Sequence, residues 1–205
     1  MRTPLPVLAA GLAASLVSGA AGAASISYVS QDRFVSVMSF FDGSSDSDAA
    51  TGFSPFASAA DILHARASQD STLGSTTIDG DLSAFIFDAA DAASHFDLTF
   101  TIDETTPFTL AGSVTGDREA SFRLSEVGGS DVVNVYLGSP SEVFDVDGVL
   151  AAGTYEIAAR AGAFPGALPE SLDNRVRFDF ALVPEPGTAM LLLAGLAACC
   201  GLRRN

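Results

Sequence analysis

The sequence predicts an all-β fold: a single antiparallel β-sandwich domain, jelly-roll-like, over residues 25–182. Two observations favour this class. Apolar and polar residues alternate over several short segments, most strictly over Phe96–Ile102, as expected for strands with one buried face. Glycine- and aspartate-containing turn signals separate these segments at intervals of about ten residues, which is typical of antiparallel sandwiches. The domain is flanked by two terminal segments of different character.

The expected strands cover much of the domain. Besides 96–102, they lie at 25–41, 108–115, 120–125, 132–137, 153–159 and 175–183. In the last of these, Val176, Phe178 and Phe180 share one face, whereas Arg175 and Arg177 lie on the other. Turn signals at 115–117, 128–129, 147–148 and 152–153 separate the runs.

The segment Ala57–Gln69 allows two interpretations. Its alanine content, after Ser54-Pro55, suits a helix. Its small and apolar residues also recur with a period of two, which suits a strand. We favour the strand.

Residues 1–24 have the composition of a signal peptide. A basic Arg2 precedes an apolar run over 5–17, and small residues follow it. Ala21-Gly22-Ala23 fits the small-x-small pattern that signal peptidases require. We predict an N-terminal signal helix cleaved after Ala23 or Ala24. The export translocon and signal peptidase are therefore expected partners.

Residues 183–205 form three consecutive parts. Val183, Pro184, Glu185 and Pro186 make a stiff, non-helical start, and an apolar, charge-free helix is expected over 188–202. Fifteen residues span about 22 Å, less than the hydrocarbon core of about 30 Å, so a transmembrane helix of this length is a poor permanent anchor. The basic tail, Arg203 and Arg204, should stay cytoplasmic and leave the domain outside.

This order of motif, apolar helix and arginines resembles the PEP-CTERM sorting signal of Gram-negative bacteria. The resemblance implies that an exosortase, a membrane protease, processes the chain near Pro184-Glu185-Pro186, with Glu185 as the residue it reads. It also implies association with extracellular polysaccharide and biofilm. A looser resemblance to uncharacterised PEP-CTERM proteins involves three internal segments and implies no chemistry: Ser30-Gln31-Asp32-Arg33, Gly52–Phe56 and Ala67-Ser68-Gln69.

The charge of the chain excludes one class of partner. Its formal net charge is −15, and residues 25–183 hold seven arginines against 24 acidic residues. Such a surface repels nucleic acid, so we expect no nucleic-acid partner. The same residues contain no cysteine, so the fold must rest on its apolar core rather than on disulfides.

No catalytic motif is evident. The domain has only two histidines, His64 and His95, neither in a recognisable motif, and it lacks Gly-x-Ser-x-Gly. With 25 acidic residues, carboxylate pairs of the glycosidase type occur everywhere and single out no site. We therefore expect no enzyme activity.

Calcium is the one cofactor that the sequence suggests. Asp42, Asp46 and Asp48 lie within seven residues, and oxygen ligands suit Ca²⁺. Asp145 and Asp147 resemble the first half of an EF-hand loop with Glu156 at its twelfth position, but Val149 and Leu150 break the pattern. Asp79-Gly80-Asp81 is a third candidate loop. Each can equally be a solvated acidic turn.

The resulting expectation is an exported, non-catalytic cell-surface or extracellular-matrix protein. It would be held transiently in the inner membrane and then released to the surface by an exosortase-type protease. The alternatives are a carbohydrate- or calcium-binding extracellular module and a secreted hydrolase. For carbohydrate binding the aromatic residues are unfavourable, because the chain has no tryptophan and three tyrosines, and its 15 phenylalanines mostly fall at core positions of strands.

Overall fold

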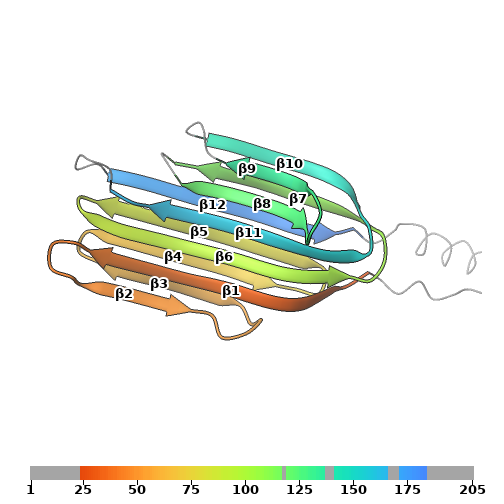
Figure 1. Ribbon diagram of the computed structural model, residues 1–205, viewed down its shortest axis with the longest axis horizontal. Helices are drawn as coiled ribbons and strands as arrows, with labels where there is room; N and C mark the ends of the chain where they lie inside the picture. Colours follow the sequence, from red (N-terminus) through yellow and green to blue (C-terminus); the bar gives the residue numbers. More distant parts are fainter. Residues whose placement is uncertain (1–23, 117–118, 137–140, 166–170, 184–205) are drawn as a thin grey trace, which may run out of the picture.

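The computed structural model of the protein describes residues 24–116, 119–136, 141–165 and 171–183. These residues form twelve β-strands and no helix, so the all-β prediction is confirmed for them. Two six-stranded sheets pack face to face as a sandwich (Figure 1). All strand pairs are antiparallel.

Sheet A has the order β2-β1-β6-β11-β8-β9. Its strands are β2 (Ser45–Ala49), β1 (Ile26–Ser39), β6 (Ala90–Ile102), β11 (Gly153–Ala163), β8 (Ala120–Glu126) and β9 (Asp131–Tyr136). Sheet B has the order β10-β7-β12-β5-β4-β3. Its strands are β10 (Ser141–Leu150), β7 (Thr106–Thr115), β12 (Ser171–Leu182), β5 (Thr77–Phe87), β4 (Ala65–Leu73) and β3 (Phe56–Ile62).

Most connections cross from one sheet to the other. Only the links β1–β2, β3–β4, β4–β5 and β8–β9 stay within a sheet. The strands β5 to β12 form two facing quartets, β5-β12-β7-β10 and β6-β11-β8-β9. The hairpin β1–β2 extends sheet A beyond β6, and the hairpin β3–β4 extends sheet B beyond β5, on the same side of the sandwich.

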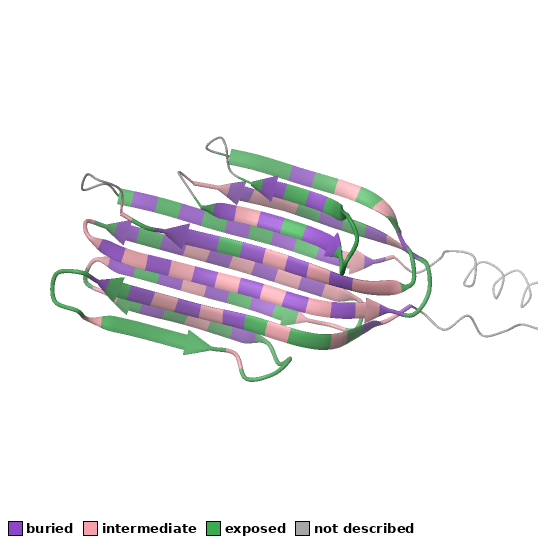
Figure 2. Cartoon of the chain, in the orientation of Figure 1, coloured by how far each residue is buried: buried purple, intermediate pink, exposed green. Residues whose placement is uncertain are grey.

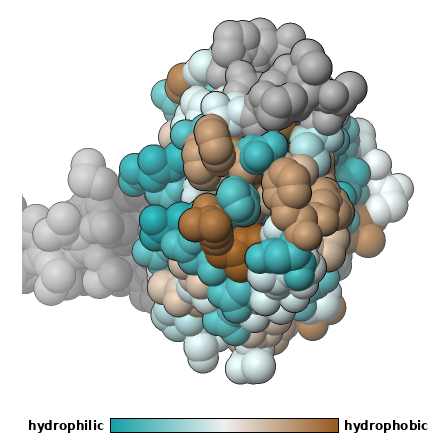
Figure 3. All heavy atoms as spheres, turned by 90° about the vertical axis from the view of Figure 1, so that its left-hand side faces the viewer, coloured by the Kyte–Doolittle hydropathy of each residue, from teal (hydrophilic) through white to brown (hydrophobic). Residues whose placement is uncertain are grey.

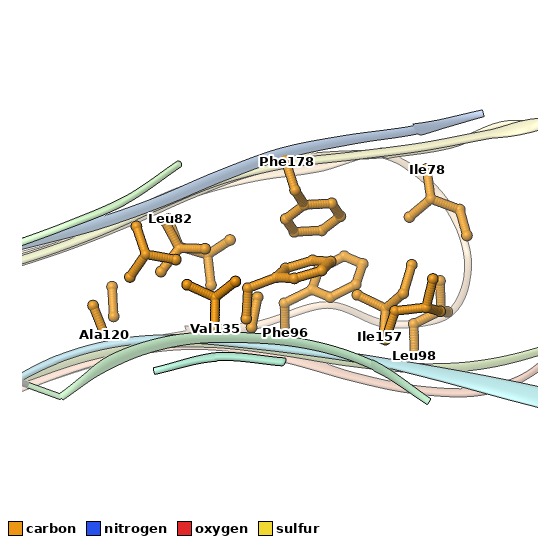
Figure 4. Packing of buried hydrophobic residues seen from close by; sticks show 14 of the residues in the cluster. Ile78, Leu82, Phe96, Leu98, Ala120, Val135, Ile157 and Phe178 are labelled. Atoms are coloured by element: carbon orange, nitrogen blue, oxygen red, sulfur yellow. The ribbon is translucent and has the colours of Figure 1, made fainter. Parts of the chain in front are cut away.

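The core lies between the sheets, and buried residues alternate with exposed ones along nearly every strand (Figure 2). Phe178 of sheet B meets two rings of sheet A: its centroid is 5.2 Å from that of Phe96 and 5.0 Å from that of Phe122. Figure 4 shows Phe178 descending from one sheet toward Phe96 on the other. Gly80 makes room for this ring, since a Cβ there would lie 2.4 Å from Phe178 Cε1.

One large polar side chain lies inside this core. Arg33 is 1% exposed. Its guanidinium donates to Gln31 Oε1, Ser71 Oγ, and the backbone oxygens of Gly52 and Ser54, at 2.8–3.0 Å. The segments of the looser sequence resemblance around Arg33 and Gly52 therefore meet at a structural contact: the buried arginine fastens the β2–β3 connection to the sandwich edge.

Three local predictions need correction. The segment Ala57–Gln69 is extended as favoured, but it is a hairpin of β3 and β4 that turns at Leu63-His64, not one strand. Asp147-Gly148 is not a turn; it lies within β10 and pairs with Thr109 and Phe108. Asp79-Gly80-Asp81 is not a loop but the middle of β5. In both acidic segments every second residue faces the sandwich interior, and this periodicity outweighs the turn preference of Asp-Gly.

The described chain starts and ends at the same end of the sandwich (Figure 1). The Ile26 amide donates to Ser75 O, and the Leu182 amide donates to Thr76 O, the next residue. The transmembrane helix predicted for 188–202 lies outside the described residues, as does the signal helix predicted for 1–24 except for Ala24. Within the described part, no helix is long and apolar enough to cross a membrane.

Candidate functional site

The outer face of sheet A carries a hollow of about 380 Å³, here called the sheet A groove. It crosses β1, β6, β11, β8 and β9. Its lining combines aromatic and charged side chains over a floor of small residues: Phe34, Ala93, His95, Glu119, Ser121, Tyr136, Arg160, Gly162 and Phe164.

Strand register brings these residues together. Phe34 on β1 lies opposite His95 on β6, His95 opposite Arg160 on β11, and Arg160 opposite Ser121, which in turn lies opposite Tyr136 on β9. One row across five strands therefore holds three rings and a guanidinium. Such a row is invisible to short-range sequence motifs, because its members are up to 102 positions apart.

Polar contacts fix the centre of the row. His95 Nε2 lies 2.7 Å from Asp97 Oδ2, and the Phe34 ring stacks on the His95 ring at 4.9 Å between centroids. Arg160 Nη2 lies 3.8 Å from the same Asp97 oxygen, but its side chain stays 61% exposed. The guanidinium is therefore available to a ligand while the imidazole is held in place. His95 is thus better placed than its sequence context indicated, because Asp97 orients it.

The aromatic side chains of the groove face solvent. Tyr136 is 67% exposed and Phe164 is 42% exposed. The expectation that the phenylalanines are mostly core holds for eight of them, but six are exposed. One of these six, Phe164, follows β11 directly. Alternation identifies inward-facing phenylalanines on strands, but it cannot recognise rings placed by turns and strand ends.

The groove continues toward β2 as a second hollow of about 350 Å³, which shares Ala93 and Phe164 with the first. Asp91 lines this extension together with serines of β1 and β2. Burial raises the pKa of Asp91, and the negative charge of Glu119 raises it further. Acidic residues therefore line both hollows: Glu119 lines the first, and Asp46 and Asp91 line the second.

The outer face of sheet B carries a different, more polar groove over β3, β4, β5 and β12. Arg175 pairs with Asp81 there, with Nε 2.8 Å from Oδ1. Next to this pair, Asp79 of β5 lies directly opposite Asp179 of β12. Burial raises the pKa of Asp79, and the nearby Asp179 raises it further by charge and hydrogen bonding. No aromatic side chain lines this groove, although Phe85 and Phe87 are exposed further along the same face of β5.

The candidate calcium ligands do not converge. Asp42 accepts hydrogen bonds from the amide and hydroxyl of Ser44, and these bonds lower its pKa to about 2. Asp46 and Asp48 lie on β2 and accept from the Asp61 amide and the Ser58 hydroxyl, respectively. Among the residues that the structure describes, no three acidic, histidine or cysteine side chains come together to hold a metal ion.

The second acidic candidate is also dispersed. Asp145 and Asp147 are exposed on the edge strand β10 of sheet B, whereas Glu156 lies on β11 of sheet A. The EF-hand interpretation is therefore wrong, because the segment is a strand and not a loop. The described structure gives no geometric support for a calcium site at either set.

The end of the sandwich opposite the chain termini is rich in apolar side chains. Phe40, Phe41, Leu63 and Phe87 are each more than half exposed there, and His64 lies against Phe41. Figure 3 shows this end, with apolar patches separated by hydrophilic residues. The patches are interrupted and not hollowed, so they form no site of the kind seen on sheet A. His64 makes no described polar contact that would suit catalysis.

The sorting and cleavage residues lie almost entirely outside the described part of the chain. Ala24 is described and is 9% exposed, whereas Ala23 is not described. Val183 is described, and its amide donates to Pro107 O at 2.8 Å. Pro184, Glu185, Pro186, Arg203 and Arg204 lie beyond the last described residue.

Comparisons with known proteins give little that bears on function. No protein-family model matches the chain, and no curated protein matches it. Among solved structures, it is similar to the enzymatically active domain of tailspike protein 4 of bacteriophage CBA120, at 14% identity and a TM-score of 0.27. That match covers 60% of this chain but only 20% of the tailspike chain.

The tailspike match corrects one expectation. The sequence predicts no catalysis, whereas a solved structure to which this chain is similar is an enzymatically active domain. The exclusion of enzyme activity is therefore withdrawn. At this identity and TM-score the likeness assigns no activity, substrate or site to the present chain.

Proposed function

We propose that this chain is an exported cell-surface or extracellular-matrix protein whose β-sandwich binds polysaccharide in the sheet A groove. The observation that carries the proposal is the lining of the sheet A groove. It combines the exposed rings of Tyr136 and Phe164 with the exposed guanidinium of Arg160, beside the half-buried stack of Phe34 on His95. The groove lies away from the chain termini: Phe34 is eight residues along β1 from Ile26, or about 26 Å.

The chemistry of the lining suits sugars. Aromatic rings offer a flat apolar surface on which the C–H face of a pyranose can rest. The Arg160 guanidinium offers charged donors for the hydroxyl groups of a sugar. The lining spans five strands, so the hollow suits a segment of a longer chain better than a single sugar.

The terminal segments support export and sorting. The N-terminal charge, apolar run and small residues fit a signal peptide, and 183–205 resembles a PEP-CTERM signal. On this proposal the translocon exports the chain, the C-terminal helix holds it transiently in the inner membrane, and an exosortase-type protease releases it near Pro184-Glu185-Pro186. Intact-mass measurement of the protein from its host tests this step. A mature chain that still ends in Leu202-Arg203-Arg204-Asn205 would contradict it.

The finer architecture is part of the same proposal. We propose that β5 to β12 form a jelly roll, extended on one side by the hairpins β1–β2 and β3–β4. The strand orders β5-β12-β7-β10 and β6-β11-β8-β9 support this interpretation, since each quartet alternates early and late strands. In this arrangement the sheet A groove lies on the β6-β11-β8-β9 quartet and its β1 extension.

Polysaccharide binding is tested with the full chain against a panel of soluble polysaccharides, by the retardation of its migration in polysaccharide-containing gels. Replacing Tyr136 and Phe164 together by Ala should weaken binding about tenfold or more, because each ring contributes stacking and apolar area. Replacing Phe40 and Phe41 together by Ala is the matched control, since these exposed rings lie outside the groove. Equal retardation of both variants, or no retardation of the native chain by any polysaccharide, would refute the proposal.

A further inference from the structure

We infer that the sheet A groove takes a polysaccharide whose sugars carry free amino groups, and that one ammonium lies between Asp91 and Glu119 against the ring of Phe164. This inference rests on the proposed function, because it names the class of glycan for the same groove. It assigns a role to two carboxylates that neutral-sugar binding leaves unused.

The geometry places one ring and one carboxylate over the same spot of the floor. A Cβ built on Gly162 would lie 2.9 Å from Phe164 Cε2 and 3.5 Å from Glu119 Oε2. Because Gly162 has no Cβ, the Phe164 ring can pack directly against the sheet at this position. Asp91 lines the extension of the groove, and Phe164 lines this extension too. A ligand group lying on Phe164 is therefore next to both hollows, one lined by Glu119 and the other by Asp91.

The two carboxylates interact unfavourably with each other in the empty groove. Asp91 is partly buried, and the charge of Glu119 adds to the cost of ionising it. An ammonium ion between them would remove this repulsion. The face of Phe164 would attract the same cation through the ring quadrupole.

The described cations near the groove do not neutralise this pair. The Arg160 side chain lies 3.8 Å from Asp97. His95 also bonds to Asp97. Among the residues that the structure describes, no ion pair involves Asp91 or Glu119.

The backbone at Glu119 gives an independent indication. Glu119 has a φ of 58°, in the left-handed region that glycine and asparagine occupy with less strain. The Gly162 amide donates to Glu119 O at 3.0 Å and holds this conformation. Strained backbone of this kind concentrates at functional sites. A glutamate in this strained conformation is consistent with a functional role for its carboxylate in the groove.

The whole domain favours the same class of ligand. With seven arginines against 24 acidic residues in 25–183, its field attracts a cationic polymer and repels one that carries uronic acids. That field acts at long range and is not specific. The pair around Phe164 supplies the specific contact, and the experiment must separate the two effects.

Calorimetric titration of the full chain with three oligosaccharides of equal length provides the test: β-linked glucosamine with free amines, the same oligomer fully N-acetylated, and a uronic acid oligomer. We expect the free-amine oligomer to bind about tenfold more tightly than the acetylated one, and the uronic acid oligomer to bind most weakly. The variant with Asp91→Asn and Glu119→Gln should lose that tenfold preference and keep its affinity for the acetylated oligomer.

The matched control carries Asp79→Asn and Asp179→Asn, which remove the same two charges from sheet B. It should keep the preference for free amines. Equal loss in both variants would mean a non-specific attraction to the acidic domain and would overturn the inference. Equal affinity of the native chain for the amine and acetylated oligomers would overturn it too, while leaving the proposed function intact. Failure to bind these oligomers or any polysaccharide of the panel would overturn both. Thermal unfolding of each variant checks that it is folded.

Discussion

The buried Arg33 makes a quantitative prediction for the stability of the sandwich. Replacing it by Met keeps most of the side-chain volume but removes four donated hydrogen bonds. The hydroxyl of Ser71 is 1% exposed and would lose this partner, which costs about 1–3 kcal/mol. The oxygens of Gly52 and Ser54 can regain water because both residues are exposed, so they contribute less.

Two effects act in opposite directions in the Arg33→Met variant. Removing a buried guanidinium relieves its desolvation cost, which is evident in the lowered pKa of Arg33. Losing the bonds releases the β2–β3 connection and leaves polar groups unpaired. The four hydrogen bonds to the charged guanidinium stabilise the fold by more than its desolvation costs, so we expect a net destabilisation of about 3 kcal/mol. For a domain of this size, that corresponds to a fall in Tm of about 6–12 °C.

Thermal unfolding followed by circular dichroism measures this change. The control is Arg175→Met, which removes an exposed pair with Asp81 and should cost at most about 1 kcal/mol. Limited proteolysis supplies a local readout, since cleavage within 50–55 should accelerate in Arg33→Met and not in the control. Equal Tm values for the two variants, with unchanged cleavage, would refute this view of Arg33.

Three further predictions concern the sheet B carboxylates, the core and calcium. The pKa of Asp79 is raised in the folded protein, so the destabilisation from ionising Asp79 is absent below its ordinary pKa, grows as the pH rises from there to the folded-state pKa, and is complete above it. Asp79→Asn should therefore raise Tm at pH 7 and not at pH 3, whereas Asp145→Asn, the same change on an exposed strand, should raise Tm at neither pH. Phe178→Ala removes the ring between Phe96 and Phe122 and should cost about 3–5 kcal/mol by denaturant titration, and a loss below 1 kcal/mol would contradict the packing described here. EDTA should leave the Tm of the native chain unchanged, because the candidate aspartates do not converge; a fall of several degrees would show a bound cation.

The fold class could be predicted from the sequence because the strands of a sandwich show a local alternation of apolar and polar residues. Phe96, Phe178 and Phe180 were placed on the inward face from their spacing alone, and all three are buried. Strand β10 was missed because Asp147-Gly148 has the composition of a turn, although the alternation of Phe144, Val146 and Gly148 with exposed residues continues through it. The pairing of β10 with β7 overrides this local preference.

The candidate site could not be predicted from the sequence, for a different reason. Phe34, His95, Arg160 and Tyr136 lie on four strands, and only the register of sheet A aligns them. His95 looked isolated because its partner Asp97 is two residues away, a spacing that is meaningful only once both are known to share one face of β6. Glu119 gave no signal at all, since its positive φ is a property of the folded backbone.

The most direct test of the sheet A groove is a residue-resolved titration. The backbone amides of the ¹⁵N-labelled protein would be followed by NMR while the tightest-binding oligosaccharide of the panel is added. We expect the largest chemical-shift changes at 93–97 and 160–164 and around Tyr136, with small changes over β5 and β12. Changes concentrated on β4, β5 and β12 would place the ligand on sheet B and contradict the account, and saturation without changes on β6 and β11 would contradict it equally.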